Sequence, residues 1–248
     1  MKLGGGQTND MKNGFSSALA DSWPVIKRLS NVPYALSMSK LCLMVLLLSP
    51  VGAFAADIAV AEKIAAAETE KEVSKRESLY RELGDARNTA ATAVLSRAAL
   101  SETEPGARID AVLALRKIGG PEAFKGILAA LDSQKHKGVR IQAVNALGFF
   151  NTPEALARLR DVARNDPDKD LRISAVLALS RLNDTQTLSD NFAVETDTGV
   201  KLGIIDALGR ADGGESELKK LKAKSKDAKM NERLDFYTGE KKKKGKKK

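Results

Sequence analysis

The sequence has very few of the residues that build metal, redox and stacking sites. Its 248 residues include one cysteine, Cys42, and one histidine, His136, and only 4% are aromatic. An internal disulfide, a cysteine–histidine zinc site and a Cys–His catalytic pair are therefore excluded. His136 lies between two lysines, where we expect a surface residue. No spacing of residues indicates a reaction, and we predict a protein that is not an enzyme and uses no cofactor, metal or small-molecule substrate.

Residues 38–55 have the composition of a secretion signal. A short basic start at Met38–Lys40 is followed by an apolar run over Leu41–Leu48 and by small residues at Ala53 and Ala55. We predict cleavage after Ala55 and export of the mature chain to the periplasm or the exterior. The alternative is an uncleaved membrane anchor, although this apolar stretch is shorter than the roughly 20 residues that span a bilayer.

Residues 1–37 have no periodic apolar pattern and are rich in Gly, Ser and Asn. We interpret them as an upstream mis-start or a disordered leader, and we leave them out of the fold.

A ten-residue pattern containing Ala-Val-x-Ala-Leu or a close variant recurs at intervals of 32, 32 and 29 residues. A period of this length indicates a solenoid. Within each copy the apolar residues recur three to four positions apart, as on one face of a helix, and the alanines permit close approach of a neighbouring helix. Turn residues and a second apolar helix follow, so each copy predicts a helical hairpin and no strand. The copies are Gly106–Leu115, Gly138–Leu147, Asp170–Leu179 and Gly199–Leu208.

The predicted fold is all-α, a right-handed α–α superhelix of about four to five helical hairpins over residues 56–225. Thr152 and Pro153 predict one helix start, as N-cap and first helical residue. Each hairpin lacks a core of its own, so the apolar faces are buried only in the stack. We expect a monomer. The predicted parts are a cap helix at 57–71 and repeats at about 72–103, 104–136, 137–168, 169–198 and 199–225.

The pattern Val/Leu-Arg-x-x-Ala-x-x-Ala-Leu, followed by Gly and then Pro-Glu-Ala, resembles the HEAT-like repeats. Within them it is similar to the short subtype named for phycobilisome lyases, over about Lys71–Lys224. The resemblance implies a binding scaffold whose second helices line a concave face for a protein partner. It also implies a structural ladder of one basic residue per repeat, with Asp132, Asp168 and Asp197 as acidic partners; an anion-binding stripe is the alternative. The ladder residues are Arg108, Arg140, Arg172 and Lys201.

The second helices carry the residues that we predict to contact a protein partner. Phe149 and Phe150 at the end of a first helix predict either an exposed anchor or one core ring and one turn-covering ring. Asn191 replaces an apolar residue of the other repeats and predicts a weakly packed point. The predicted partner-binding residues are Lys125, Arg158, Arg160 and Arg164. The alternative, which is favoured for any single one of these residues, is a solvated helix face.

The positive charge is concentrated at the C-terminus. Residues 219–248 contain 14 Lys and Arg against 4 Asp and Glu, whereas residues 56–218 contain 22 against 26. We predict a disordered tail over 226–248, because blocks of like charge repel one another. Such a tail attracts polyanions in a salt-dependent way, or it serves only solubility. The predicted polyanion-binding residues are Lys241, Lys242, Lys243, Lys244, Lys246, Lys247 and Lys248.

Together these features predict an exported, non-catalytic scaffold that binds another protein on its concave surface, with the tail providing electrostatic tethering. The alternative is a protein that binds a polyanion (acidic lipid, envelope polymer or nucleic acid) mainly through its lysine-rich end.

Overall fold

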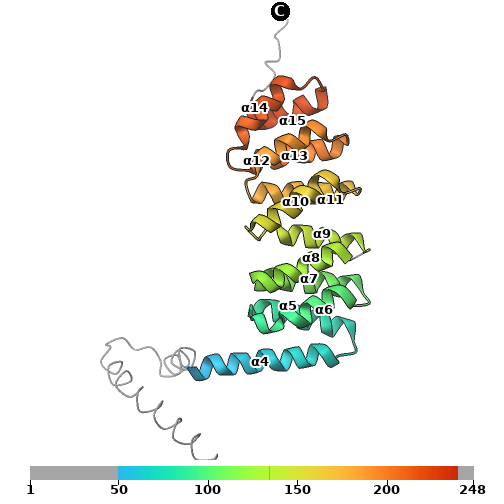
Figure 1. Ribbon diagram of the computed structural model, residues 1–248, viewed down its shortest axis with the longest axis vertical. Helices are drawn as coiled ribbons and strands as arrows, with labels where there is room; N and C mark the ends of the chain where they lie inside the picture. Colours follow the sequence, from blue (N-terminus) through green and yellow to red (C-terminus); the bar gives the residue numbers. More distant parts are fainter. Residues whose placement is uncertain (1–49, 134, 240–248) are drawn as a thin grey trace, which may run out of the picture. The chain divides into compact units, whose positions relative to one another are not determined.

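The computed structural model describes residues 50–133 and 135–239. The residues predicted as leader, the signal up to residue 49 and the seven tail lysines lie outside this range. Within it the chain is all-helical and has no strand, as predicted (Figure 1). The helices are α4 (Pro50–Thr69), α5 (Val73–Ala86), the 3₁₀ helix η1 (Thr89–Ala91), α6 (Thr92–Ser101), α7 (Pro105–Ile118), α8 (Gly120–Ser133), α9 (Lys137–Leu147), α10 (Pro153–Asn165), α11 (Lys169–Arg181), α12 (Thr185–Val194), α13 (Thr198–Arg210), α14 (Gly214–Lys224) and α15 (Ala228–Thr238).

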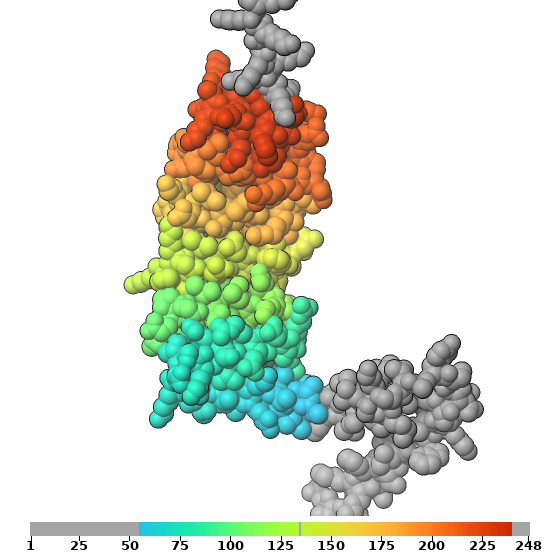
Figure 2. All heavy atoms as spheres, turned by 180° about the vertical axis from the view of Figure 1, so that it is seen from behind, coloured from blue at the N-terminus to red at the C-terminus, as the bar shows by residue number. Residues whose placement is uncertain are grey.

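Helices α5 to α14 form five hairpins, each with a first and a second helix. Each first helix packs on the first helix of the next hairpin, so that α5, α7, α9, α11 and α13 form one layer. The second helices α6, α8 and α10 also pack against the first helix that follows them. The space-filling view shows the segments from α5 onward succeeding one another in chain order (Figure 2). Contacts are therefore made mainly between neighbouring hairpins.

Small residues in the first-helix layer permit this close packing. A Cβ atom at Gly84 would lie 2.7 Å from the Cα of Ala114, and one at Gly148 would lie 2.8 Å from the Cβ of Ala178. At the corresponding position of the next hairpin, the buried Ser180 hydroxyl donates to the carbonyl of Ala207 at 2.8 Å. The alanine pattern in the sequence therefore specifies how near consecutive hairpins approach.

The buried apolar residues form one continuous cluster from Val60 to Leu234. The apolar residues of the repeated pattern are at its centre; Val112, Leu115, Val144 and Leu147 are all fully buried. Because no hairpin encloses a separate cluster, burial of each apolar face depends on the adjacent hairpins. The predicted helix start at Thr152 is confirmed, since its hydroxyl accepts a hydrogen bond from the amide of Ala155.

The first part of the predicted tail is a helix, and the prediction of disorder over 226–239 is wrong. Helix α15 packs on α13 and α14, with Leu234 fully buried and Met230 nearly so. The Asp227 side chain caps α15 by accepting a hydrogen bond from the amide of Met230. In the same way, the Asp197 side chain caps α13 by accepting a hydrogen bond from the amide of Val200. Asp227 and Met230 follow Asp197 and Val200 by 30 residues, so α15 corresponds to the first helix of a sixth repeat. The lysine block begins only after Gly239.

Helix α4 precedes the first hairpin and continues across the predicted cleavage position after Ala55. Its polar side chains contact α5, α6 and the turn between them. Lys63 pairs with Glu82 at 2.7 Å, Glu68 pairs with Arg97 at 3.1 Å, and Asp57 accepts from the side-chain amide of Asn88 at 2.9 Å. The α4 residues that make these contacts all follow Ala55 in the sequence. Among the described residues, none of the helices has the length and apolarity needed to span a membrane.

Candidate interaction surfaces

A ladder of arginines on the first helices α5, α7, α9 and α11 connects consecutive hairpins. Arg76 of α5 donates from Nε and Nη2 to the two carboxylate oxygens of Glu102, both at 2.7 Å. Arg108 of the next first helix donates to the backbone carbonyl of the same Glu102 at 2.6 Å. Glu102 follows α6 directly, and its side chain is only 9% exposed. One glutamate thus connects two consecutive hairpins.

The same connection recurs two hairpins further along the chain. Asp166 accepts from Arg140 Nη2 through its carboxylate at 2.6 Å and from Arg172 Nη1 through its carbonyl at 3.0 Å. Arg172 in turn forms a two-pronged pair with Glu195, at 2.9 and 3.1 Å. Such paired, largely buried hydrogen bonds fix geometry more strongly than exposed ion pairs do.

The acidic partners predicted for this ladder are wrong. Asp132 pairs with Arg158, while Asp168 and Asp197 cap α11 and α13 through their side chains. The true partners occupy the position directly after a second helix, where a carboxylate can reach back to the preceding first helix. A signal was present in the sequence, because Glu102 and Asp166 each follow their arginine by 26 residues.

Burial and pairing shift the pKa values of the ladder groups in opposite directions. The hydrogen bond from the Arg76 guanidinium lowers the pKa of Glu102. Burial acts to raise this pKa, and the hydrogen bond from the Tyr80 hydroxyl acts to lower it further. Burial raises the pKa of Tyr80, and its hydrogen bond to Glu102 adds to that shift. Burial opposes ionisation of Glu195, but its hydrogen bonds from Arg172 and from backbone amides leave its pKa below the usual value. Both glutamates are therefore held as carboxylates at neutral pH.

Lys201 occupies the ladder position of the last complete hairpin and lies over an aromatic ring. Its Nζ is 5.5 Å from the ring centroid of Phe192. A lysine ammonium cannot form the two-pronged pair of an arginine. The guanidinium ladder described above is not continued at this position.

Two of the four predicted partner-binding residues instead join consecutive hairpins. Arg158 of α10 pairs with Asp132 at the end of α8 and with Asp161. Arg160 pairs with Asp184 in the following hairpin turn at 2.7 Å, and the Asp184 side chain is only 10% exposed. Their charges are neutralised within the protein, which reduces their availability to a partner.

The other two predicted residues remain on the surface. Lys125 is 68% exposed and pairs with Glu122 on the same helix at 2.8 Å. Arg164 is exposed at the edge of a small polar pocket of about 270 Å³, which also contains Asn191. Asn191 is buried and its amide nitrogen has no hydrogen-bond partner. Asn191 thus leaves an unpaired buried donor beside this pocket, and the weak packing predicted there stays a prediction.

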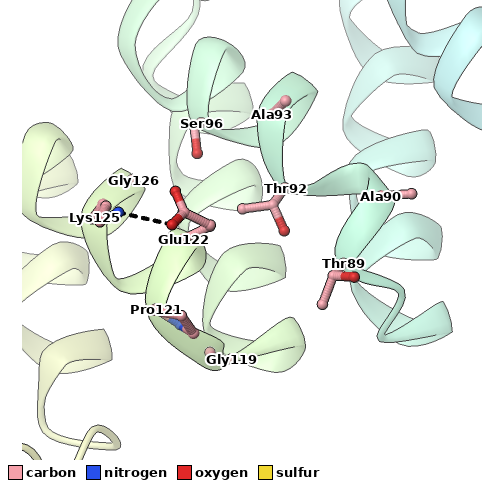
Figure 3. Close-up of a pocket in the computed structure, with 11 residues that line it drawn as sticks. Thr89, Ala90, Thr92, Ala93, Ser96, Gly119, Pro121, Glu122, Lys125 and Gly126 are labelled. Carbon is pink, nitrogen blue, oxygen red and sulfur yellow. Dashed lines mark hydrogen bonds and ion pairs between the residues drawn. The ribbon is translucent and has the colours of Figure 1, made fainter.

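An open groove of about 630 Å³ separates the beginnings of α6 and α8. Figure 3 shows Thr92 and Ser96 of α6 on one side and Glu122 and Lys125 of α8 on the other. The remaining lining is of small residues: Thr89, Ala90, Ala93, Gly119, Gly120, Pro121 and Gly126.

A single glycine shapes the inner end of this groove. A Cβ atom at Gly126 would lie 2.3 Å from the Ser96 hydroxyl, so α8 approaches α6 closely there. The matching position of the next hairpin is Arg158, one repeat period further on. The close approach at Gly126 is therefore not repeated at the matching position of the next hairpin. The groove's lining of small side chains with three hydroxyl-bearing residues and one ion pair suits contact with a peptide or protein surface.

The two phenylalanines after α9 have separate environments. The Phe150 ring packs on Phe124 of α8, with centroids 5.5 Å apart. Phe149 is 57% exposed. No group of His, Cys, Asp and Glu side chains suited to a metal ion occurs within residues 50–133 and 135–239.

Comparison with known families agrees with this architecture. The family model for HEAT repeats matches residues 124–209, and the model for the PBS lyase HEAT-like repeat matches residues 107–133. A search among curated proteins finds no match. HEAT repeats in general serve as non-catalytic scaffolds for protein interaction. The repeat pattern, the stacked helical hairpins and these two matches together identify residues 107–209 as HEAT-like repeats.

Proposed function

We propose that this protein is an exported, non-catalytic scaffold that binds another protein on the surface formed by its second helices. The groove between α6 and α8 carries the proposal, because it is open, lined by small residues and next to exposed Lys125. A partner segment can enter it without displacing a buried side chain.

The proposed export is compatible with the contacts of α4. Cleavage after Ala55 leaves Ala56–Thr69, which retains Asp57, Lys63 and Glu68 and their pairs with the first hairpin. Cell fractionation and N-terminal sequencing test this part. We expect an exported chain that begins at Ala56; a cytoplasmic chain that retains residues 38–55 would contradict it.

Photo-crosslinking in the producing cell tests the groove. A photoreactive amino acid replaces Ala93, which is exposed at the groove, or Ala61, which is exposed on α4 and is not among the residues that line the groove. We expect a discrete protein adduct from position 93 and none from position 61. Absence of an adduct from position 93, or the same adducts from both positions, would contradict docking in the groove.

The lysine tail is proposed to tether the scaffold to an anionic envelope surface, at about 1 kcal/mol per lysine near acidic lipids. Its deletion must begin after Gly239, because removing 226–248 would also remove α15 and uncover the last hairpin. We expect deletion of 240–248 to abolish sedimentation with anionic vesicles and to preserve the crosslink from position 93. Loss of the crosslink as well would favour the alternative, a polyanion-binding protein acting mainly through its tail.

A further inference from the structure

Two arginines from alternate first helices converge on one exposed phenylalanine. Arg116 lies in the last turn of α7, Phe149 follows the C-cap residue of α9, and Arg181 is the last residue of α11. The guanidinium carbons are 4.7 Å and 5.2 Å from the Phe149 ring centroid. More than half of the Phe149 side chain nevertheless remains exposed. We refer to these three residues as the Arg–Phe cluster.

The two guanidinium groups have no acidic counterpart among the described residues. Most other arginines of the described repeats pair with a carboxylate, including Arg76, Arg140 and Arg172 of the ladder. The acidic groups near the cluster's helix ends are already used, since Asp85 pairs with Lys117 and Asp184 pairs with Arg160. Burial first, and the positive charge of Arg116 second, lower the pKa of Arg181. The cluster therefore holds two neighbouring charges that the protein does not neutralise.

The position of Arg181 is built into the packing. A Cβ atom at Gly148 would lie 2.8 Å from Arg181 Nη1, so the absence of a side chain there lets the guanidinium lie against the backbone. Cations in the last turn of a helix are favoured by the helix dipole. That preference explains the charge of Arg116 and Arg181, but it does not explain their convergence on an exposed ring.

We propose that the Arg–Phe cluster is a second binding site, which takes an acidic segment of a protein partner. A guanidinium matches a carboxylate with two parallel hydrogen bonds, so two acidic side chains can each engage one arginine. An apolar side chain between them covers the open part of the Phe149 ring. Arginine and aromatic residues are frequent centres of binding energy at protein interfaces. The proposal does not depend on the groove.

The charge of the repeats favours a short acidic segment over a long polyanion. Residues 56–218 contain 26 acidic and 22 basic side chains, so these residues as a whole carry a net negative charge. An extended nucleic acid would lie over many of these residues, whereas a segment with a few carboxylates needs only the positive charge of the two arginines.

Fluorescence anisotropy with the full-length chain tests the site. The probe is a fluorescein-labelled peptide in which glutamates flank a central Leu–Phe pair, and the matched probe has glutamine in place of each glutamate. The double variant Arg116→Gln/Arg181→Gln removes the cluster's charges. The control Arg87→Gln/Arg210→Gln removes the same charge from the ends of α5 and α13, so the contribution of the lysine tail is equal in both.

We expect the cluster variant to weaken binding of the acidic peptide by about tenfold and the control to weaken it less than about twofold. Phe149→Ala weakens it as well, and the glutamine peptide does not compete. Melting temperatures of both double variants remain near that of the parent. Equal losses in the two variants, or no loss in the cluster variant, would overturn the proposal. Tighter binding of a short oligothymidylate that depends on Arg116 and Arg181 would assign the cluster to nucleic acid instead.

Discussion

At the scale of single residues, the buried polar groups differ in whether they have hydrogen-bond partners, and this difference determines their effect on stability. Glu102 is satisfied by Arg76, Tyr80 and the adjacent backbone, so its burial is compensated. Asn191 has the opposite situation, because its buried amide nitrogen lacks a partner. An unpaired buried donor costs free energy, while a paired buried charge becomes costly only when its partner is removed.

Replacing Asn191 by leucine should stabilise the protein. Leucine restores the apolar residue found at the matching position of α10, Leu159, which is fully buried. Removing the unpaired amide should raise the free energy of unfolding by about 1–2 kcal/mol. Denaturant unfolding followed by circular dichroism measures the change. A lower midpoint for Asn191→Leu would show that the amide has a favourable role in the native protein.

Glu102→Gln should destabilise the protein at neutral pH and flatten its response to acid. The native pKa of Glu102 lies below its ordinary value, so the unfolded chain binds more protons at mildly acidic pH. The stabilisation is therefore complete above the unfolded-state pKa and disappears as pH falls through the native pKa. We expect a loss of about 2–3 kcal/mol at pH 7.

Melting temperatures measured from pH 7 downward test this prediction. The control is Glu122→Gln, which breaks an exposed pair of similar length, Glu122 with Lys125, and should change stability by less than about 0.5 kcal/mol. Equal effects of the two substitutions, or an acid dependence in Glu102→Gln as steep as that of the parent, would contradict a structural role for the ladder.

At the scale of helices, stability depends on close approach between consecutive first helices. Gly148 and Gly203 provide a comparison, because a Cβ atom at Gly203 would meet Ile173 only at an ordinary 3.7 Å. Gly148→Ala forces a contact with Ala178 and should cost about 1–3 kcal/mol. Gly203→Ala removes a flexible residue from a helix interior and should gain about 0.5–1 kcal/mol. Urea unfolding of both variants measures these changes in the free energy of unfolding. A change of the same sign in both variants would contradict close packing as the reason for glycine at position 148.

Helix α15 gives a second test at this scale. Leu234→Ala should lower the free energy of unfolding by about 2–4 kcal/mol, since Leu234 is fully buried. Its neighbour Phe236 is 74% exposed, so Phe236→Ala should change stability little. Calorimetric melting of the two variants makes the comparison. Equal, small effects would mean that α15 does not pack on the last hairpin in solution.

The sequence predicts the repeated helices well because their alanines and branched residues recur with a fixed period. The same reasoning misses α15, where Met230, Leu234 and Tyr237 fill the places that Val200, Ile204 and Ala207 fill one repeat earlier. The large Tyr237 ring is accommodated because it packs against Gly209. A pattern defined by residue type cannot detect such a compensating exchange between two helices.

At the scale of the whole described stack, the sites are formed by residues that lie close in space and far apart in the sequence. The Arg–Phe cluster leaves no periodic signal, because Arg116 is one position out of register with Phe149 and Arg181. The ladder was predicted with the correct arginines and the wrong acids, since several aspartates near each turn are equally close in sequence. The interval of 26 residues from Arg76 to Glu102 and from Arg140 to Asp166 distinguishes these acids from the other aspartates, and the end of the second helix at that point gives its physical reason.

The central claim is that each hairpin is stable only when packed against its neighbours. Thermal unfolding of an excised α9–α10 hairpin, residues 137–168, followed by far-ultraviolet circular dichroism, tests it directly. We predict little helix and no cooperative transition in the fragment, against a cooperative transition in the full chain. A helical fragment that melts cooperatively would contradict the account, because the hairpin would then fold without the stack.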